Sequence, residues 1–145
     1  MIAFLLENLD QIIFILVSII TSILGYIVGR KHQLFIEKRS RLIERYQKLY
    51  APFEKQYLKN CTGAFYFSDL PNEEQELFLT ILYDNYEYTD SKLKNLIYEF
   101  NSSYRGSDID IDAANLKFHE IACHISDEFD KIGKKLFFEP HNINA

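Results

Sequence analysis

Residues 11–29 read QIIFILVSIITSILGYIVG, a run without a charged side chain in which twelve of the nineteen residues are Ile, Leu, Val or Phe. A helix rises about 1.5 Å per residue and needs about 20 apolar residues to cross a hydrocarbon layer roughly 30 Å thick. The run is just long enough. Residues 1–29 are therefore predicted to form a short N-terminus followed by one transmembrane helix.

Two other interpretations of this run fit less well. A cleaved signal peptide would begin with basic residues, carry a shorter apolar run and end at small residues. Here the charged side chains before Arg30 are Glu7 and Asp10, and both are acidic. A core helix of a soluble protein would show a polar face, whereas Ser18 is the one polar residue between Ile12 and Ile20.

Basic residues gather directly after the apolar run. Residues 30–48 carry seven Lys or Arg against two Glu, and no Lys or Arg precedes residue 30. Segments that stay in the cytoplasm are enriched in Lys and Arg close to the membrane. We therefore expect a single-pass protein with its N-terminus outside and its C-terminal domain in the cytoplasm.

Small and polar residues recur at alternating spacings of three and four along the apolar run. With Ile15 among them, these positions form a face that we call the seam: Asn8, Gln11, Ile15, Ser18, Ser22, Gly25 and Gly29. This spacing is typical of a helix that packs against copies of itself, and small residues four apart let helix backbones approach closely in lipid. The seam predicts a parallel homo-oligomer. The alternative is that these residues are tolerated by chance.

The polar members of the seam leave two kinds of oligomer open. Asn8, Gln11, Ser18 and Ser22 around a shared axis could line a narrow polar path without the cost of a buried charge. A tightly packed dimer would instead be dry. The sequence does not decide between a conducting path and a packing interface.

The helix is predicted to continue past the membrane as a basic stalk over residues 30–51. This segment contains neither Gly nor Pro, and Pro52 is expected to end it, because proline lacks the backbone N–H and its ring obstructs the preceding turn. The spacing of the seam also continues into the stalk, and these positions are expected to face the same way: His32, Ile36, Arg39, Ile43, Tyr46, Tyr50 and Phe53.

Residues 52–145 are predicted to form a small cytoplasmic helical bundle, which makes the whole chain all-α. A short helix is expected to stop at Gly63. Pro71 and the acidic residues behind it predict the start of a second helix, and the segment Thr89-Asp90-Ser91 is expected to cap a third. The last and longest helix is expected to begin near Asp110.

Charge and cysteine content narrow the function. The chain has a net charge of −5, and residues 49–145 carry nine Lys or Arg against seventeen Asp or Glu. Because this domain would repel phosphates, duplex nucleic acid is not an expected partner. Cys61 and Cys123 lie far apart in helix-like segments, which favours reduced thiols and no disulfide framework.

Neither an enzyme nor a cofactor is predicted. The sequence has no Gly-rich phosphate loop, no nucleophile elbow and no convergent set of acid and base residues. The acidic segment 108–112 lacks the Gly and Glu that an EF-hand requires. In 119–124, HEIACH, His119 and Cys123 share one helix face, but two ligands do not make a metal site, and no metal is predicted. Glu120 and His124 are expected to pair across one turn.

The stalk also carries a candidate site for an anion, which we call the collar: Arg39, Arg41, Arg45, Lys48, Tyr46 and Tyr50. In an oligomer, rings of Arg could bind a phosphorylated ligand while the tyrosines stack on bases. The alternative is contact with anionic lipid headgroups, worth about 1 kcal/mol per basic residue. Arg45 and Lys48, however, lie roughly 20 Å or more beyond Gly29 along a helix.

In its layout the chain resembles the small membrane effectors of bacterial anti-phage defence systems. The junction RYQKLYAPF at 45–53 also resembles junctions in uncharacterised bacterial membrane proteins. The resemblance assigns no functional residues. It implies a pore-forming or membrane-perturbing effector in the bacterial inner membrane, controlled by a nucleotide or oligonucleotide. The alternative is a membrane-tethered adaptor whose acidic domain binds a protein.

Overall fold

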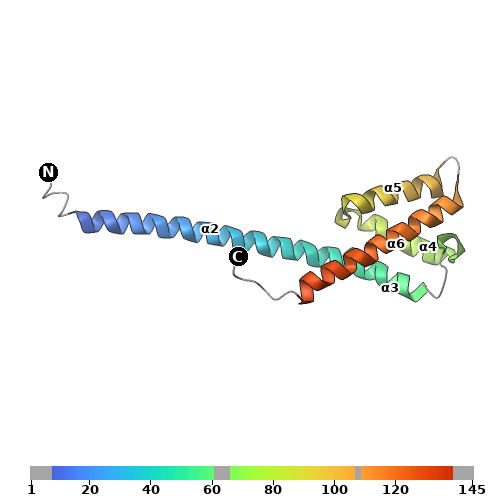
Figure 1. The fold of residues 1–145 in the computed structure, drawn as a ribbon, viewed down its shortest axis with the longest axis horizontal. Coiled ribbons are helices and arrows are strands. Elements are labelled where there is room, and N and C mark those ends of the chain that lie inside the picture. Colours follow the sequence, from blue (N-terminus) through green and yellow to red (C-terminus); the bar gives the residue numbers. More distant parts are fainter. Residues whose placement is uncertain (1–7, 61–65, 107–108, 139–145) are drawn as a thin grey trace. The chain divides into compact units, whose positions relative to one another are not determined.

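The computed structural model describes residues 8–60, 66–106 and 109–138 (Figure 1). Throughout these ranges the regular structure is helical, without a strand, which confirms the expected all-α class. The backbone divides into two compact units, Met1–Ser40 and Arg41–Ala145. The expected boundaries at residues 29/30 and 51/52 stay predictions.

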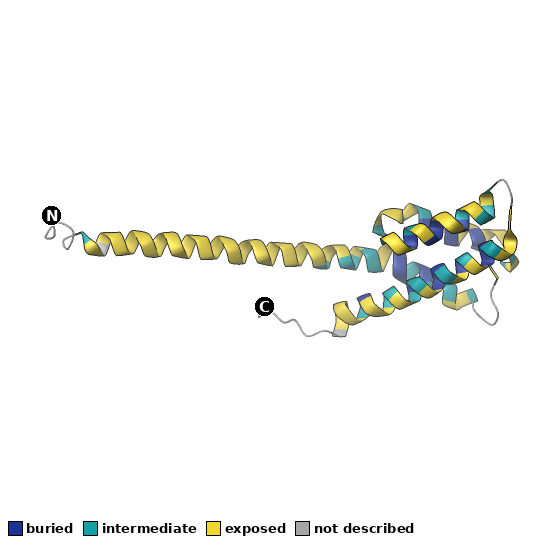
Figure 2. Cartoon of the chain, turned by 45° about the horizontal axis from the view of Figure 1, so that its top comes forward, coloured by how far each residue is buried: buried dark blue, intermediate teal, exposed yellow. Residues whose placement is uncertain are grey.

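Helix α2 spans Leu9–Arg45 and contains the whole apolar run. In the first unit every side chain from Gln11 to Lys38 is exposed, as the colouring of Figure 2 shows. This helix is long and apolar enough to cross a membrane. None of the Ile, Leu, Val and Phe side chains of this run is buried among the described residues, so their apolar surface is available to lipid or to another chain.

Pro52 does not end the helix, and this expectation was wrong. A π-helical turn, η1 (Tyr46–Tyr50), follows α2, and α3 (Ala51–Asn60) follows η1 directly. The N–H of Ala51 bonds to the carbonyl of Tyr46, five residues back. Pro52 is the second residue of α3, so helical backbone both precedes and follows it. The wider turn before it relieves the clash that a regular α-helix would have there.

The second unit contains three further α-helices, α4 (Asn72–Asp84), α5 (Ser91–Arg105) and α6 (Ile111–Gly133). Short turns accompany them: η2 (Phe67–Asp69), η3 (Tyr86–Tyr88) and η4 (Lys134–Phe138). The three expected helix starts are confirmed, because Pro71, Asp90 and Asp110 directly precede the three helices. The expected stop at Gly63 lies outside the described residues.

Two aspartates cap their helices through side-chain hydrogen bonds. A carboxylate oxygen of Asp90 accepts from the Leu93 N–H at 2.8 Å, and one of Asp110 accepts from the Ala113 N–H at 2.9 Å. Each satisfies a backbone donor that the helix itself leaves unpaired.

Helices α5 and α6 run antiparallel. Lys117 of α6 pairs with Glu99 of α5 at 2.8 Å, and His124, further along α6, pairs with Asp90, at the start of α5. Residues later in α6 therefore pair with residues earlier in or before α5. Figure 1 shows the same arrangement.

The core of the second unit is built around Phe118 of α6. The centroid of its ring lies 4.5–6.0 Å from the centroids of four other phenylalanines. These are Phe53 of α3, Phe67 of η2, Phe78 of α4 and Phe100 of α5, and all five rings are 0–1 % exposed. Four separate segments thus each pack one aromatic ring against Phe118 of α6.

The last positions that continue the spacing of the seam beyond Gly29 belong to this core or pack against it. Tyr50 and Phe53 are fully buried, and the ring of Tyr46 stacks on Phe129 at 5.0 Å between centroids. Ile43 packs against the same cluster. The chain's own α6 therefore uses these positions, whereas the seam residues from Gln11 to Gly29 on α2 are exposed.

We expect Phe118→Ala to lower the free energy of unfolding of the second unit by about 3–5 kcal/mol, because it leaves a cavity among four rings. Near-ultraviolet circular dichroism of the full chain in detergent would measure this, since nine of its ten tyrosines lie beyond residue 45. Leu116→Ala is the matched control, because Leu116 is 57 % exposed on the same helix. Equal destabilisation by the two substitutions would contradict the assignment of Phe118 to the centre of the core.

Candidate functional site

The seam residues from Gln11 to Gly29 lie on one side of α2, and no contact among the described residues accounts for the two glycines. A Cβ atom added at Gly25 or at Gly29 would meet no atom within 4 Å. Glycine in the middle of a helix costs about 1 kcal/mol relative to alanine. Two glycines four residues apart therefore weaken the isolated helix, and close approach of a second helix is the familiar compensation.

The hydroxyl groups of the apolar run already donate within the helix. Ser18 donates to the carbonyl of Phe14, Thr21 to that of Val17 and Ser22 to that of Ser18, each at 2.8 Å. Their protons are therefore satisfied without water or a neighbouring helix, and they cost little in lipid. This pattern suits a dry packing face as well as a polar one. Gln11, towards the start of α2, is exposed.

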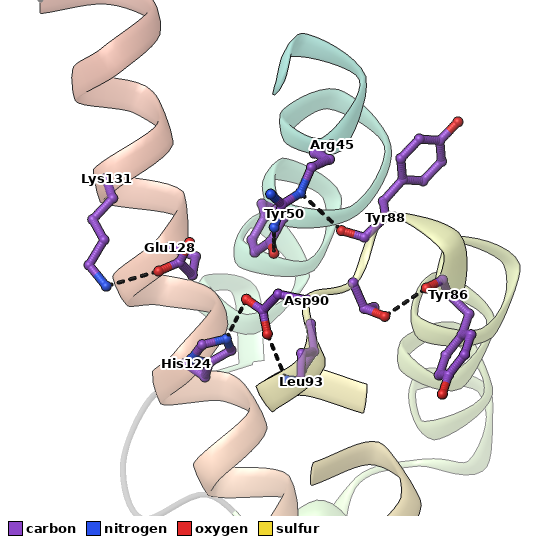
Figure 3. A network of polar contacts seen from close by, with 10 residues as sticks. Arg45, Tyr50, Tyr86, Tyr88, Asp90, Leu93, His124, Glu128 and Lys131 are labelled. Atoms are coloured by element: carbon purple, nitrogen blue, oxygen red, sulfur yellow. Dashed lines mark hydrogen bonds and ion pairs between the residues drawn. The ribbon is translucent and has the colours of Figure 1, made fainter. Parts of the chain in front are cut away.

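Most of the collar is engaged by the second unit itself (Figure 3). The Arg45 guanidinium donates to the backbone carbonyl of Tyr88 at 3.0 Å and to the Tyr50 hydroxyl at 2.8 Å. The Lys48 ammonium donates to the Tyr88 hydroxyl at 2.7 Å and lies 4.9 Å from the centroid of its ring. Sequence reasoning missed Tyr88, because its contacts with Arg45 and Lys48 join residues forty or more positions apart.

The tyrosines of the collar differ from what base stacking would need. Tyr50 is 0 % exposed, and Tyr46 is half-buried between the rings of Phe129 and Phe137. Burial raises the pKa of the Tyr50 hydroxyl, although the hydrogen bond and charge of Arg45 oppose the rise. Arg39 is half-exposed and Arg41 exposed on α2. The anion-binding role of the collar stays a prediction.

His124 and Asp90 form the polar contact that ties α6 to the start of α5 (Figure 3). The Nε2 atom of His124 lies 2.9 Å from a carboxylate oxygen of Asp90, and the His124 side chain is only 10 % exposed. The expected pairing of Glu120 with His124 was wrong. His124 faces α5, whereas the Glu120 carboxylate accepts from the Lys117 ammonium at 3.1 Å.

The Asp90 carboxylate is held in its charged form. Burial by itself would raise its pKa. The hydrogen bonds from the Leu93 N–H and from His124, with the positive charges of His124 and Arg45, outweigh burial and hold the pKa below its ordinary value. A carboxylate with a depressed pKa adds stability above its unfolded pKa of about 3.9, and this stability is lost as the pH falls through its folded pKa.

We expect Asp90→Asn to lower the stability of the second unit by about 1 kcal/mol near neutral pH, because asparagine keeps the cap but loses the charge. The gap from the wild type should stay constant above about pH 5 and narrow only below about pH 4, as the pH falls through the depressed folded pKa of Asp90. Thermal melts of the full chain in detergent on both sides of these pH values would measure it. Asp127→Asn, an exposed position on α6, is the control. A gap that does not narrow below about pH 4 would contradict the charged role of Asp90.

The fold and these contacts define an all-helical protein with one helix able to span a membrane and a folded helical unit after it. Comparison with protein families, with curated proteins and with solved structures gives no match. The function is therefore argued from the chain's own geometry.

Proposed function

We propose that this protein is a single-pass membrane effector that self-associates through the seam and whose cytoplasmic helical domain controls a pore or a disruption of the membrane. The observation that carries the proposal is the pair Gly25 and Gly29, which weakens an exposed apolar helix and, among the residues that the structure describes, lies beside no other segment. The positive residues 30–48 support a cytoplasmic domain. The resemblance to anti-phage effectors supports a bacterial inner membrane as the proposed location.

The proposed signal acts on the turns where the domain begins. Helix α2 has no break before Arg45, and Tyr50 and Phe53, which follow within eight residues, are part of the core. Arg45 is held by a neutral carbonyl and a neutral hydroxyl, and a phosphate of a nucleotide or short oligonucleotide is a stronger acceptor for a guanidinium. A ligand that captured Arg45 would release the Tyr88 carbonyl and repack the start of the domain.

Replacing the seam glycines tests self-association. We expect Gly25→Leu/Gly29→Leu to shift the detergent-solubilised protein from an oligomer to a monomer, because the added side chains hold the helix backbones apart. The near-ultraviolet spectrum of the domain should not change. Analytical ultracentrifugation measures the mass of the protein alone. The matched control is Ile20→Ala/Ile27→Ala, since both isoleucines lie about 160–200° around the helix from the seam.

An oligomer that persists in the glycine variant, or one that the isoleucine variant disrupts equally, would overturn the role of the seam. A protein that is monomeric in the wild type as well would do the same. The glycine variant adds apolar bulk to the seam, whereas the isoleucine variant removes apolar bulk from the opposite face of α2.

The adaptor remains a second candidate because the second unit exposes aromatic side chains on an acidic domain. Tyr98 is 73 % exposed and Tyr66 is 54 % exposed. Tyrosines of this kind are enriched where proteins bind one another. In this alternative the membrane helix only localises the domain, and its sequence has no further role.

Exchange of residues 11–29 for a Leu-rich helix of the same length separates the two candidates. We expect the exchanged protein to lose the leakage of dye from vesicles that the wild type causes in the presence of its activating signal. Mononucleotides and short oligonucleotides, added to the domain side, are the first probes. Leakage that survives the exchange would contradict a working role for the seam, whereas a wild type that causes no leakage with any of these probes would favour the adaptor.

A further inference from the structure

A cysteine and a histidine stand side by side on the exposed surface of α6. The Sγ atom of Cys123 lies 3.5 Å from the Nε2 atom of His119, one helical turn earlier, and both residues are exposed. Neither side chain belongs to the hydrophobic core. The buried face of α6, with Phe118, Ile121, Ala122 and Ile125, lies on another side of the helix.

The distance between these two atoms matches that between two ligands of one zinc ion. Zinc bonds cysteine sulfur at about 2.3 Å and histidine nitrogen at about 2.0–2.1 Å, and in a tetrahedral site these lengths place the two ligand atoms about 3.6 Å apart. The pair can therefore receive a zinc ion with very little movement of either side chain. Such preorganisation reduces the entropic cost of binding.

The surroundings favour a cation and a second chain. Asp127 is exposed one turn beyond Cys123, and its negative charge attracts metal ions. The nearby ammonium of Lys117 is engaged by Glu99 and Glu120. Leu116 is 57 % exposed three residues before His119 and offers apolar surface beside the pair.

Two ligands are half of a tetrahedral set. Within the described ranges 8–60, 66–106 and 109–138, no group of three or more His, Cys, Asp or Glu side chains could hold a metal ion. Structural zinc sites almost always have four protein ligands. A second copy of this chain, related by a two-fold axis, would present the same histidine and cysteine and complete the set.

We propose that His119 and Cys123 of two copies bind one zinc ion between them in a Cys2His2 site. Each thiol releases its proton to solvent as its sulfur bonds the metal. The site would join two domains in a way that depends on zinc concentration and on pH. This zinc site rests on the proposed self-association only because it needs two copies of the chain to meet. It would add a metal-dependent contact outside the membrane helix.

Titration of the full-length protein in detergent with Co²⁺, under a reductant that does not bind metals, tests the site. Tetrahedral cobalt bound by cysteine gives intense visible bands and a sulfur-to-metal charge-transfer band, whereas aqueous cobalt does not. We expect these bands to saturate at one metal ion per two chains and to disappear when excess Zn²⁺ is added.

Single substitutions identify the ligands. We expect His119→Ala and Cys123→Ser each to abolish the charge-transfer band and the metal-dependent association while leaving the near-ultraviolet spectrum of the domain unchanged. Cys61→Ser and His32→Ala are the matched controls and should bind cobalt as the wild type does. Saturation at one metal per chain, bands that survive Cys123→Ser, or bands lost in Cys61→Ser would overturn the proposal.

The same titration on Gly25→Leu/Gly29→Leu separates this site from the seam. If the variant is monomeric without metal but dimerises with Co²⁺, the zinc site and the seam are both supported. If the wild type is monomeric without metal and dimerises with it, the zinc site stands and the seam fails. If the wild type is oligomeric, the glycine variant is monomeric and neither gives cobalt bands, the seam stands and the zinc site fails.

Discussion

The packing of four aromatic rings against Phe118 is the contact on which the second unit depends. Each ring comes from a different segment, and the one on α3, Phe53, lies 6.0 Å from Phe118 between ring centroids. Because α3 follows η1 directly and η1 follows α2, the cluster also fixes where the long helix becomes part of a folded unit. Loss of the cluster would free α3, η1 and the last turns of α2 together.

Polar contacts at the start of the domain join the same segments in addition to this packing. Arg45 reaches the backbone of Tyr88, and Asp90, two residues later, reaches His124 on α6. One short segment, 88–90, therefore holds both the end of α2 and the middle of α6 (Figure 3). A ligand that competes for either contact would act on both, since the two lie within three residues of one another. This is the physical basis for placing the proposed signal here.

The parts of the fold that depend on neighbouring residues were predictable. The apolar run, the caps Asp90 and Asp110 and the helix start at Pro71 all follow from local rules of helix formation. The error at Pro52 arose because a local rule was applied without the π-helical turn that makes room for the ring. The contacts of Arg45 with Tyr88 and of His124 with Asp90 span distances in the sequence at which spacing carries no information.

The candidate site, like the fold, was predictable only in the features that depend on spacing in the sequence. The seam could be listed from spacing alone. The structure was needed to show that Tyr50 and Phe53, which continue the same spacing, are buried in the chain's own core. The spacing of His119 and Cys123 was visible in the sequence. Their exposure, and the separation that suits a shared metal ion, required the structure.

The central claim is that α2 meets its copies through the seam, and disulfide scanning in native membranes tests it most directly. Single cysteine substitutions at positions 15 to 29, in a chain with Cys61→Ser and Cys123→Ser, would be oxidised and the yield of cross-linked dimer measured. The account predicts maxima at positions 15, 18, 22, 25 and 29 and minima at 20 and 27. Uniform yields, or maxima on the face of Ile20 and Ile27, would contradict it.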